Sequence, residues 1–205
     1  MVMIREDVSF SSDGDTCAAW LYPATSDPAP RPIIVMAHGT SGTRRDGLVG
    51  FADRFAAAGI VALVFDHRGF GDSAGERDLF DPARQLDDWR AAIAFARSLP
   101  DIDPDRVVTF GSSVGGGNAL AATADDPRVA AAISQVPFLD MSQAPFSPQV
   151  REEMQAVAAK GGHLPAVGQP HEAAFINAPG PRLVGVASLR TAMNLAGGIA
   201  YQRLG

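Results

Sequence analysis

Several features are scarce in this chain of 205 residues, and each scarcity excludes a class of protein. Cys17 is the only cysteine, so the chain can form neither an internal disulfide nor a cysteine-based zinc cluster, which favours a reducing, cytoplasmic location. No run of 18 apolar residues occurs, and no apolar stretch precedes Glu6 and Asp7, so the sequence predicts neither a membrane span nor an export signal. Basic residues number 17 against 23 acidic ones, a formal charge of −6, so we expect no binding to nucleic acid.

The composition that remains is that of one globular domain, because 46% of the residues are hydrophobic and 20% are charged. Two β-prone pieces, 8–10 and 17–22, flank a turn-forming cluster and predict an opening hairpin. Four continuous apolar runs follow and predict strands buried on both faces, at 33–37, 60–65, 107–110 and 129–136.

Helical patterns alternate with these four runs. Apolar residues at helical spacing predict helices over 47–58, 82–99 and 115–123. Asp81 is the expected N-cap of the second helix. Residues 103–105 are expected to break the chain before the third run. Strands and helices that alternate in this way predict an α/β fold, a mostly parallel sheet with helices on both faces.

The alternation stops after Pro137. Residues 148–160 have a helical pattern, and 183–204 suit a helix better than a strand at 183–187. We therefore divide the chain into an α/β core at 1–140 and a lid-like or inserted segment at 141–205, mostly helix and loop.

One motif indicates chemistry. Residues 111–115 read G-S-S-V-G, a G-x-S-x-G sequence, and lie directly between a predicted buried strand and a predicted helix. A sharp turn at this junction lifts the Ser113 hydroxyl above the sheet, and the amide of Val114 points to the same place. We therefore predict Ser113 as a nucleophile, against the alternative of a glycine-rich packing turn. Residues 115–117 are all glycine, which we attribute to close packing of the helix.

Two polar loops follow neighbouring predicted strands on the same rim. The first, H-G-T-S-G at 38–42, can direct a second N–H, that of Thr40, at a developing oxyanion. We expect the His38 ring to order this loop rather than to react. The second loop, D-H-R-G-F-G-D-S at 66–73, is expected to use its charges to order the backbone.

These motifs together resemble the α/β-hydrolase superfamily, particularly its dienelactone-hydrolase-like and acyl-esterase or peptidase-like members. The resemblance covers residues 8–140, including the strand V-A-A-A-I-S-Q-V-P-F-L-D. It implies Ser113 as nucleophile and the amides of Thr40 and Val114 as the oxyanion hole. It also implies hydrolysis of an ester, lactone or amide without a cofactor or metal, and a small-molecule substrate.

The sequence departs from the family pattern after residue 140. The family places its acid and histidine after two further strands, but no Asp or Glu follows Glu172 and no His follows His171. Asp140 with His163 or His171 is the substitute set that the chain order permits. The alternative is a shortened, catalytically silent homologue, or a module that binds a partner.

A sheet truncated after about the sixth strand would leave 129–136 at its edge. The unpaired N–H and C=O groups of such an edge invite pairing with another chain. We therefore expect either a homodimer through this edge or poor solubility.

Overall fold

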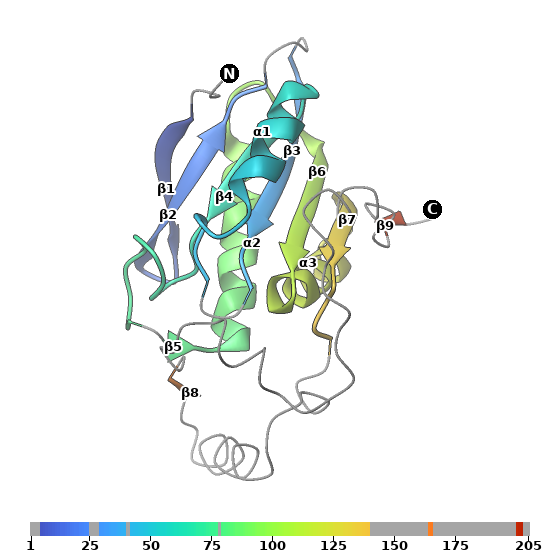
Figure 1. The fold of residues 1–205 in the computed structure, drawn as a ribbon. Helices are drawn as coiled ribbons and strands as arrows, with labels where there is room; N and C mark the ends of the chain where they lie inside the picture. The colour runs from blue at the N-terminus through green and yellow to red at the C-terminus, as the bar shows by residue number, and fades with distance from the viewer. Residues whose placement is uncertain are drawn as a thin grey trace.

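The structure is a computed structural model that describes residues 5–24, 29–39, 42–77 and 79–139, and the backbone of 164–165 and 200–202. Seven strands form one sheet in the order β1-β2-β4-β3-β6-β7-β9 (Figure 1). The four central strands, β4, β3, β6 and β7, run parallel to one another. The predicted α/β-hydrolase type of fold is therefore confirmed.

The sheet begins with the predicted hairpin. Strands β1 (Glu6–Ser12) and β2 (Asp15–Tyr22) pair antiparallel over their whole lengths. The turn between them places Asp13 and Gly14 at positive φ, 47° and 86°, a region that Asp and Gly tolerate better than most residues. Strand β2 then pairs antiparallel with β4 (Val61–Phe65), so the hairpin extends the parallel sheet on one side.

The central strands match the apolar runs. Every residue of β4 is buried, and so are the last five residues of β3 (Arg31–Ala37), as two covered faces require. Strand β7 (Val129–Gln135) also lies where predicted. Strand β6 (Ile102–Ser112) begins earlier than expected, because Ile102 already pairs with Arg31. The predicted break at 103–105 is instead a register shift within β6, with its residues bulging toward solvent.

Helices cover both faces of the sheet. Helix α1 (Val49–Ala57) packs on one face, against a core that includes Ile34, Met36 and Val64. Helices α2 (Pro82–Ser98) and α3 (Val114–Asp125) pack on the other face, where alternate residues of the same strands point. Asp81 caps α2 as predicted, accepting from the N–H groups of Ala83 and Arg84.

Two short strands come from the region after 140. Strand β8 (Leu164–Pro165) pairs with β5 (Leu79–Phe80), apart from the main sheet. Strand β9 (Ala200–Gln202) pairs antiparallel with Ala131, Ala132 and Ile133 of β7.

The β9 pairing corrects two expectations. The predicted helix over 183–204 is wrong at 200–202, which form a strand, and the predicted open edge of β7 is covered at its middle. The physical reason is that the backbone groups of β7 find a partner within the same chain. Dimerisation rested on that edge and stays a prediction. Apart from β8 and β9, the expected lid-like segment 141–205 lies outside the described residues, as does the candidate strand 183–187. No helix of the described part is long and apolar enough to span a membrane.

Candidate active site

The site lies where the strand order reverses. Strand β3 has β4 on one side and β6 on the other, so the loops that follow β3 and β6 leave the sheet side by side. In open α/β sheets this place, outside the carboxyl ends of the strands, is where ligands bind. His38 and Gly39 follow β3, and Ser113 follows β6.

Ser113 has the backbone of a strained turn. Its φ of 58° and ψ of −124° lie in a region that residues other than Gly rarely adopt. Three hydrogen bonds hold it there. Its N–H donates to the carbonyl of Gln135 at 3.0 Å, and its own carbonyl accepts from Gly117 at 3.1 Å and Phe138 at 2.9 Å. The surrounding chain therefore fixes the turn between β6 and α3.

The glycines around Ser113 are required by close contacts. A Cβ on Gly111 would lie 2.0 Å from the carbonyl oxygen of Gly115, and one on Gly115 would lie 2.4 Å from that of His38. A Cβ on Gly117 would lie 2.3 Å from the carbonyl oxygen of Phe138. The prediction that 115–117 serve close packing of α3 is confirmed.

The Ser113 side chain is half-buried and lies against the loop after β3. A Cβ built on Gly39 would come within 3.2 Å of the Ser113 Cβ and 3.8 Å of its hydroxyl oxygen. The loop after β3 and the Ser113 turn are therefore in contact. Val114 begins α3, so its N–H belongs to the positive end of that helix. Thr40 lies outside the described residues.

Apolar side chains surround the start of α3. Val114 is 8% exposed and packs in a small cluster with Phe70 and Phe80, and the half-buried Phe138 packs against them. The cluster adjoins the Ser113 turn through the backbone of Val114 and Phe138.

The Ser113 hydroxyl has no hydrogen-bonding side chain among residues 5–139 that the structure describes. His38 and His67, the histidines of that part, both use Nδ1 for other partners. Asp140, His163 and His171, the substitute acid and bases, lie outside the described residues.

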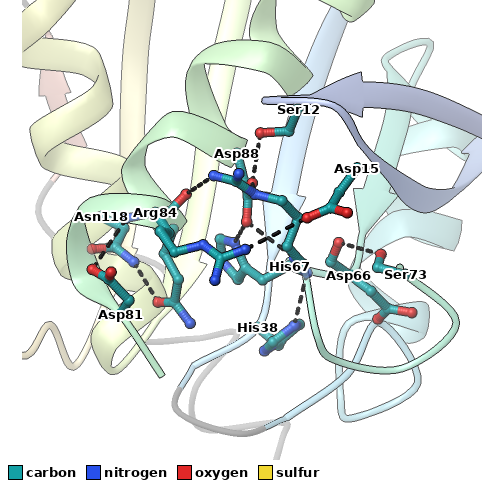
Figure 2. Close-up of polar contacts among 12 residues, drawn as sticks. Ser12, Asp15, His38, Asp66, His67, Ser73, Asp81, Arg84, Asp88 and Asn118 are labelled. Atoms are coloured by element: carbon teal, nitrogen blue, oxygen red, sulfur yellow. Dashed lines mark hydrogen bonds and ion pairs between the residues drawn. The ribbon is translucent and has the colours of Figure 1, made fainter. Parts of the chain in front are cut away.

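His38 lies in the loop as an ordering residue. It is 2% exposed, its Nδ1 is 2.7 Å from the carbonyl oxygen of Gly39, and its Nε2 accepts from the backbone N–H of His67 at 3.4 Å (Figure 2). The His38 and His67 rings meet edge to face at 5.0 Å. The expectation that His38 orders the loop agrees with these contacts.

Asp88 of α2 is the centre of a buried polar network that sequence reasoning missed. Its carboxylate accepts from the hydroxyl of Ser12 at 2.7 Å, from His67 Nδ1 at 3.2 Å and from the backbone N–H of Arg68 at 3.0 Å (Figure 2). The Arg68 guanidinium adds an ion pair. Burial raises the pKa of Asp88, but the hydrogen bonds from His67, Ser12 and Arg68 outweigh burial and hold this pKa below its usual value. No local pattern marked Asp88, because its partners Ser12 and Arg68 lie far from it in the sequence.

The turn at 66–73 orders the rim through charge, as predicted. Fully buried Asp66 accepts from the backbone and guanidinium of Arg44 and from the N–H of Asp72 at 3.0 Å. Hydrogen bonds from Arg45, then the charges of Arg44 and Arg45, lower the pKa of Asp72. Gly71 is required there, since its φ is 51° and a Cβ would lie 2.0 Å from an Asp66 carboxylate oxygen.

Metal ligands do not cluster in the described ranges, where no group of three or more His, Cys, Asp or Glu side chains could hold an ion.

A family comparison agrees with this geometry. The model of the serine aminopeptidase S33 family matches residues 28–172, which span β3 to β7 and both loops of the rim. The chain belongs to this family of α/β hydrolases. The structural resemblance drawn from the sequence motifs is thereby confirmed.

Curated relatives of this S33 family member carry several names. The quorum-quenching protein AidA of Acinetobacter baumannii is 57% identical over 135 residues, which are 65% of this chain and 44% of that protein. Thiohydrolase aneE of Aspergillus aculeatus is 36% identical over 124 residues, 60% of this chain and 37% of that protein. The chain thus spans less than half the length of these curated relatives.

A solved structure of similar fold is the α/β hydrolase GrgF from Penicillium sp. sh18. It superimposes with a TM-score of 0.67 at 28% identity, over 98% of this chain and 69% of that one. A polyketide transferase of the same name from Penicillium sp. is 34% identical over 143 residues, 69% of this chain and 48% of that protein.

Proposed function

We propose that this S33 family member catalyses acyl transfer from an ester, lactone or amide through an acyl-enzyme at Ser113. The observation that carries the proposal is the backbone of Ser113, held at positive φ between β6 and α3 with its side chain half-buried. Strain of this kind persists only where the surrounding structure imposes it, and it is concentrated at functional sites. The alternative, a turn that only packs α3 on the sheet, would explain the glycines. It would not explain why a serine adopts a strained conformation there.

The chemical step follows from this placement. The Ser113 oxygen attacks the substrate carbonyl carbon, a C–O bond forms, and a general base takes the hydroxyl proton. The carbonyl oxygen becomes an oxyanion, for which the N–H groups of Val114 and Thr40 are the proposed donors. The leaving group departs with the proton as the carbonyl re-forms. Water then attacks the acyl-enzyme and releases the acid.

The base of this step is also a proposal. Asp140 with His163 or His171 is the set that the sequence offers after Ser113. A serine without a base loses roughly 10⁴ to 10⁶ in turnover, so the magnitude of activity itself reports whether such a base is in place.

The names of the relatives support acyl chemistry of this breadth. A thiohydrolase and polyketide transferases lie among them, so hydrolysis and group transfer both occur among the names of the relatives. We therefore include thioesters among the proposed substrates. A small molecule is the proposed partner.

Covalent labelling tests the proposal. A fluorophosphonate probe is expected to label the wild-type chain and not Ser113→Ala. Ser112→Ala is the matched control, because Ser112 is the adjacent serine at the end of β6, and it should label like wild type. Labelling that persists in Ser113→Ala would assign the reactive group elsewhere. A wild-type chain that does not label, with ester turnover within a few-fold of Ser113→Ala, would instead identify a catalytically silent homologue.

A further inference from the structure

The chain at the end of β7 holds both polar groups of the Ser113 backbone. The N–H of Ser113 donates to the carbonyl of Gln135 at 3.0 Å, and its carbonyl accepts from the N–H of Phe138 at 2.9 Å. The same carbonyl accepts from Gly117 of α3 at 3.1 Å. The bond at the nitrogen restrains φ of Ser113 and the bonds at the carbonyl restrain ψ. These contacts therefore hold Ser113 at its φ of 58° and ψ of −124°.

The bond that reaches the Ser113 carbonyl from beyond β7 departs from regular strand pairing. Strands β6 and β7 pair in parallel with Ser112 opposite Gln135, so the next pair in this register is Ser113 with Val136. In parallel pairing, the two polar groups of one residue bond to the residues before and after its partner. For Ser113 these residues are Gln135, which does accept its N–H, and Pro137.

Pro137 explains the departure, because proline has no N–H to donate. The donor is instead the next residue, Phe138, so the segment from 135 to 138 holds one residue more than regular pairing uses. An extra residue of this kind bends the strand that carries it. The bend coincides with Val136, whose φ is 40°.

The conformation of Val136 is unfavourable for two reasons. A β-branched residue rarely adopts positive φ, and a residue before proline favours extended conformations at negative φ. Burial of the side chain does not offset this strain, because Val136 is 55% exposed. Strain of this kind persists only where the surrounding structure imposes it, and it is concentrated at functional sites.

Phe138 is fixed on two sides. A Cβ on Gly117 would lie 2.3 Å from the Phe138 carbonyl oxygen, so this oxygen packs directly on α3. The Phe138 ring packs against the apolar cluster that includes Val114. The donor to the Ser113 carbonyl is therefore held against the first turns of the helix that Ser113 precedes.

We propose that Val136 and Pro137 are positioning residues for the nucleophile. Pro137 stops the regular pairing of β7 with β6, and the bend at Val136 brings the Phe138 N–H to the Ser113 carbonyl, which holds Ser113 in its strained conformation. This inference rests on the proposed function of Ser113. In this scheme neither residue touches a reacting atom, and both act through the backbone.

Pro137→Ala tests the proposal, because it restores the missing N–H. We expect the regular pairing to continue for one more residue, with the N–H of residue 137 replacing that of Phe138 as the donor to Ser113. The fluorophosphonate labelling rate should then fall by about 10²-fold, the effect of a misplacement of about 1 Å. Pro104→Ala is the matched control, because Pro104 is an exposed proline near the opposite end of β6, and it should label like wild type.

Val136→Gly keeps Pro137 and removes only the strain of a side chain at positive φ. Glycine adopts positive φ readily, so the bend should remain and the labelling rate should stay within about threefold of wild type. A Pro137→Ala chain that labels like wild type would overturn the proposal. So would a Val136→Gly chain that loses as much labelling as Pro137→Ala.

Ser134→Ala controls for general loosening of β7 against α3. The Ser134 hydroxyl donates to the carbonyl of Gly116 at 2.9 Å, so its loss should lower the midpoint of urea unfolding without slowing the labelling of Ser113. If Pro137 contributed only to stability, labelling rates would follow the unfolding midpoints across all these variants. That result would also overturn the proposal.

Hydrogen exchange, measured by NMR on the full chain, separates this inference from the proposed function. In wild type and Val136→Gly, the Phe138 amide should exchange at least about tenfold more slowly than an unstructured amide. In Pro137→Ala, this protection should pass to the amide of residue 137. An unprotected Phe138 amide in wild type would overturn the inference whether or not Ser113 reacts.

The two remaining outcomes are also distinct. If the exchange results hold and wild type labels, but Pro137→Ala labels equally fast, then the function of Ser113 stands and the positioning role is wrong. If the exchange results hold while the wild-type chain does not label, then the proposed function of Ser113 is wrong and the positioning role is overturned with it.

Discussion

The hydroxyl of Ser12 at the end of β1 donates a 2.7 Å hydrogen bond to Asp88 in α2, although the two residues lie 76 positions apart. Both side chains are buried. The bond joins the N-terminal hairpin to α2. In that helix, Asp88 also accepts hydrogen bonds from His67 and Arg68, which follow β4. The Asp88 carboxylate therefore both stabilises the loop after β4 and attaches the N-terminal hairpin to α2.

Ser12→Ala should destabilise the protein measurably. The substitution removes one hydrogen bond to a buried charged group, an effect of about 1.5 to 3 kcal/mol. Urea unfolding at pH 7 measures the change. The control is Ser11→Ala, because Ser11 is the exposed neighbour in the same strand, and its change should stay within about 0.5 kcal/mol. Equal effects of the two substitutions would show that the Ser12 bond contributes nothing.

Asp88→Asn should lower the free energy of unfolding at neutral pH. It should also make that free energy depend less on pH in the acid range. The folded pKa of Asp88 is below its unfolded value of about 3.9. The stabilisation is therefore fully present above about pH 4 and is lost as the pH falls through the folded pKa. Removal of the charge leaves buried Arg68 with only the exposed carboxylate of Asp13 as an ion-pair partner, at a cost of up to about 3 to 5 kcal/mol.

The measurement for Asp88→Asn is urea unfolding at pH 7 and near pH 3. The difference between wild type and variant should be larger at pH 7. Asp87→Asn is the matched control, because Asp87 is half exposed and pairs only on the surface with Arg90, so its effect should be about 0.5 kcal/mol or less. A variant difference that is equal at both pH values would contradict the assigned role of the Asp88 charge.

Gly115→Ala should destabilise the protein and slow labelling of Ser113. The added Cβ would meet the His38 carbonyl oxygen at 2.4 Å, so either α3 or the loop after β3 must move, at a cost of about 1 to 3 kcal/mol. Chemical denaturation together with the labelling rate tests this. Gly50→Ala makes the same change at an exposed position of α1 and should instead stabilise by about 0.5 to 1 kcal/mol.

Cys17 should be unreactive in the folded protein. It is fully buried, and burial, followed by the nearby Asp88 charge, raises its pKa to about 12. At pH 8 the thiolate fraction would be about 10⁻⁴. Ellman's reagent should therefore detect almost no thiol in the native protein and one thiol per chain in guanidinium chloride, since Cys17 is the only cysteine. Rapid reaction of the native protein would show that β2 opens readily.

The elements of the core could be predicted because their signals are local. Continuous apolar runs identified β3, β4 and β7, and Asp81 followed by Pro82 identified the start of α2. The G-x-S-x-G motif between an apolar run and a helical pattern predicted the sharp turn at Ser113. Each of these depends on residues that are close together in the sequence.

The features that sequence reasoning missed depend on distant pairs. In the sequence, Asp88 is one of several charged residues on an amphipathic helix. Only the fold shows that Ser12 and Arg68 donate hydrogen bonds to it. The strand at 200–202 lies in a segment whose apolar spacing suits a helix, and its pairing with β7 was outside any local pattern. Thr40, Asp140, His163 and His171 remain predictions, so the nucleophile turn was predictable but its base stays untested.

The order of strands in the sheet also has a consequence for synthesis of the chain. Strand β2 pairs with β4 and not with the strand that follows it, so the finished N-terminal hairpin must wait for residues 61–65 before it can join the sheet. At typical translation rates this delay is roughly 2 to 8 seconds. Throughout it, the side of the hairpin that carries Cys17 and Ala19 lacks the residues of α2 that bury it in the finished core, so its apolar surface stays exposed.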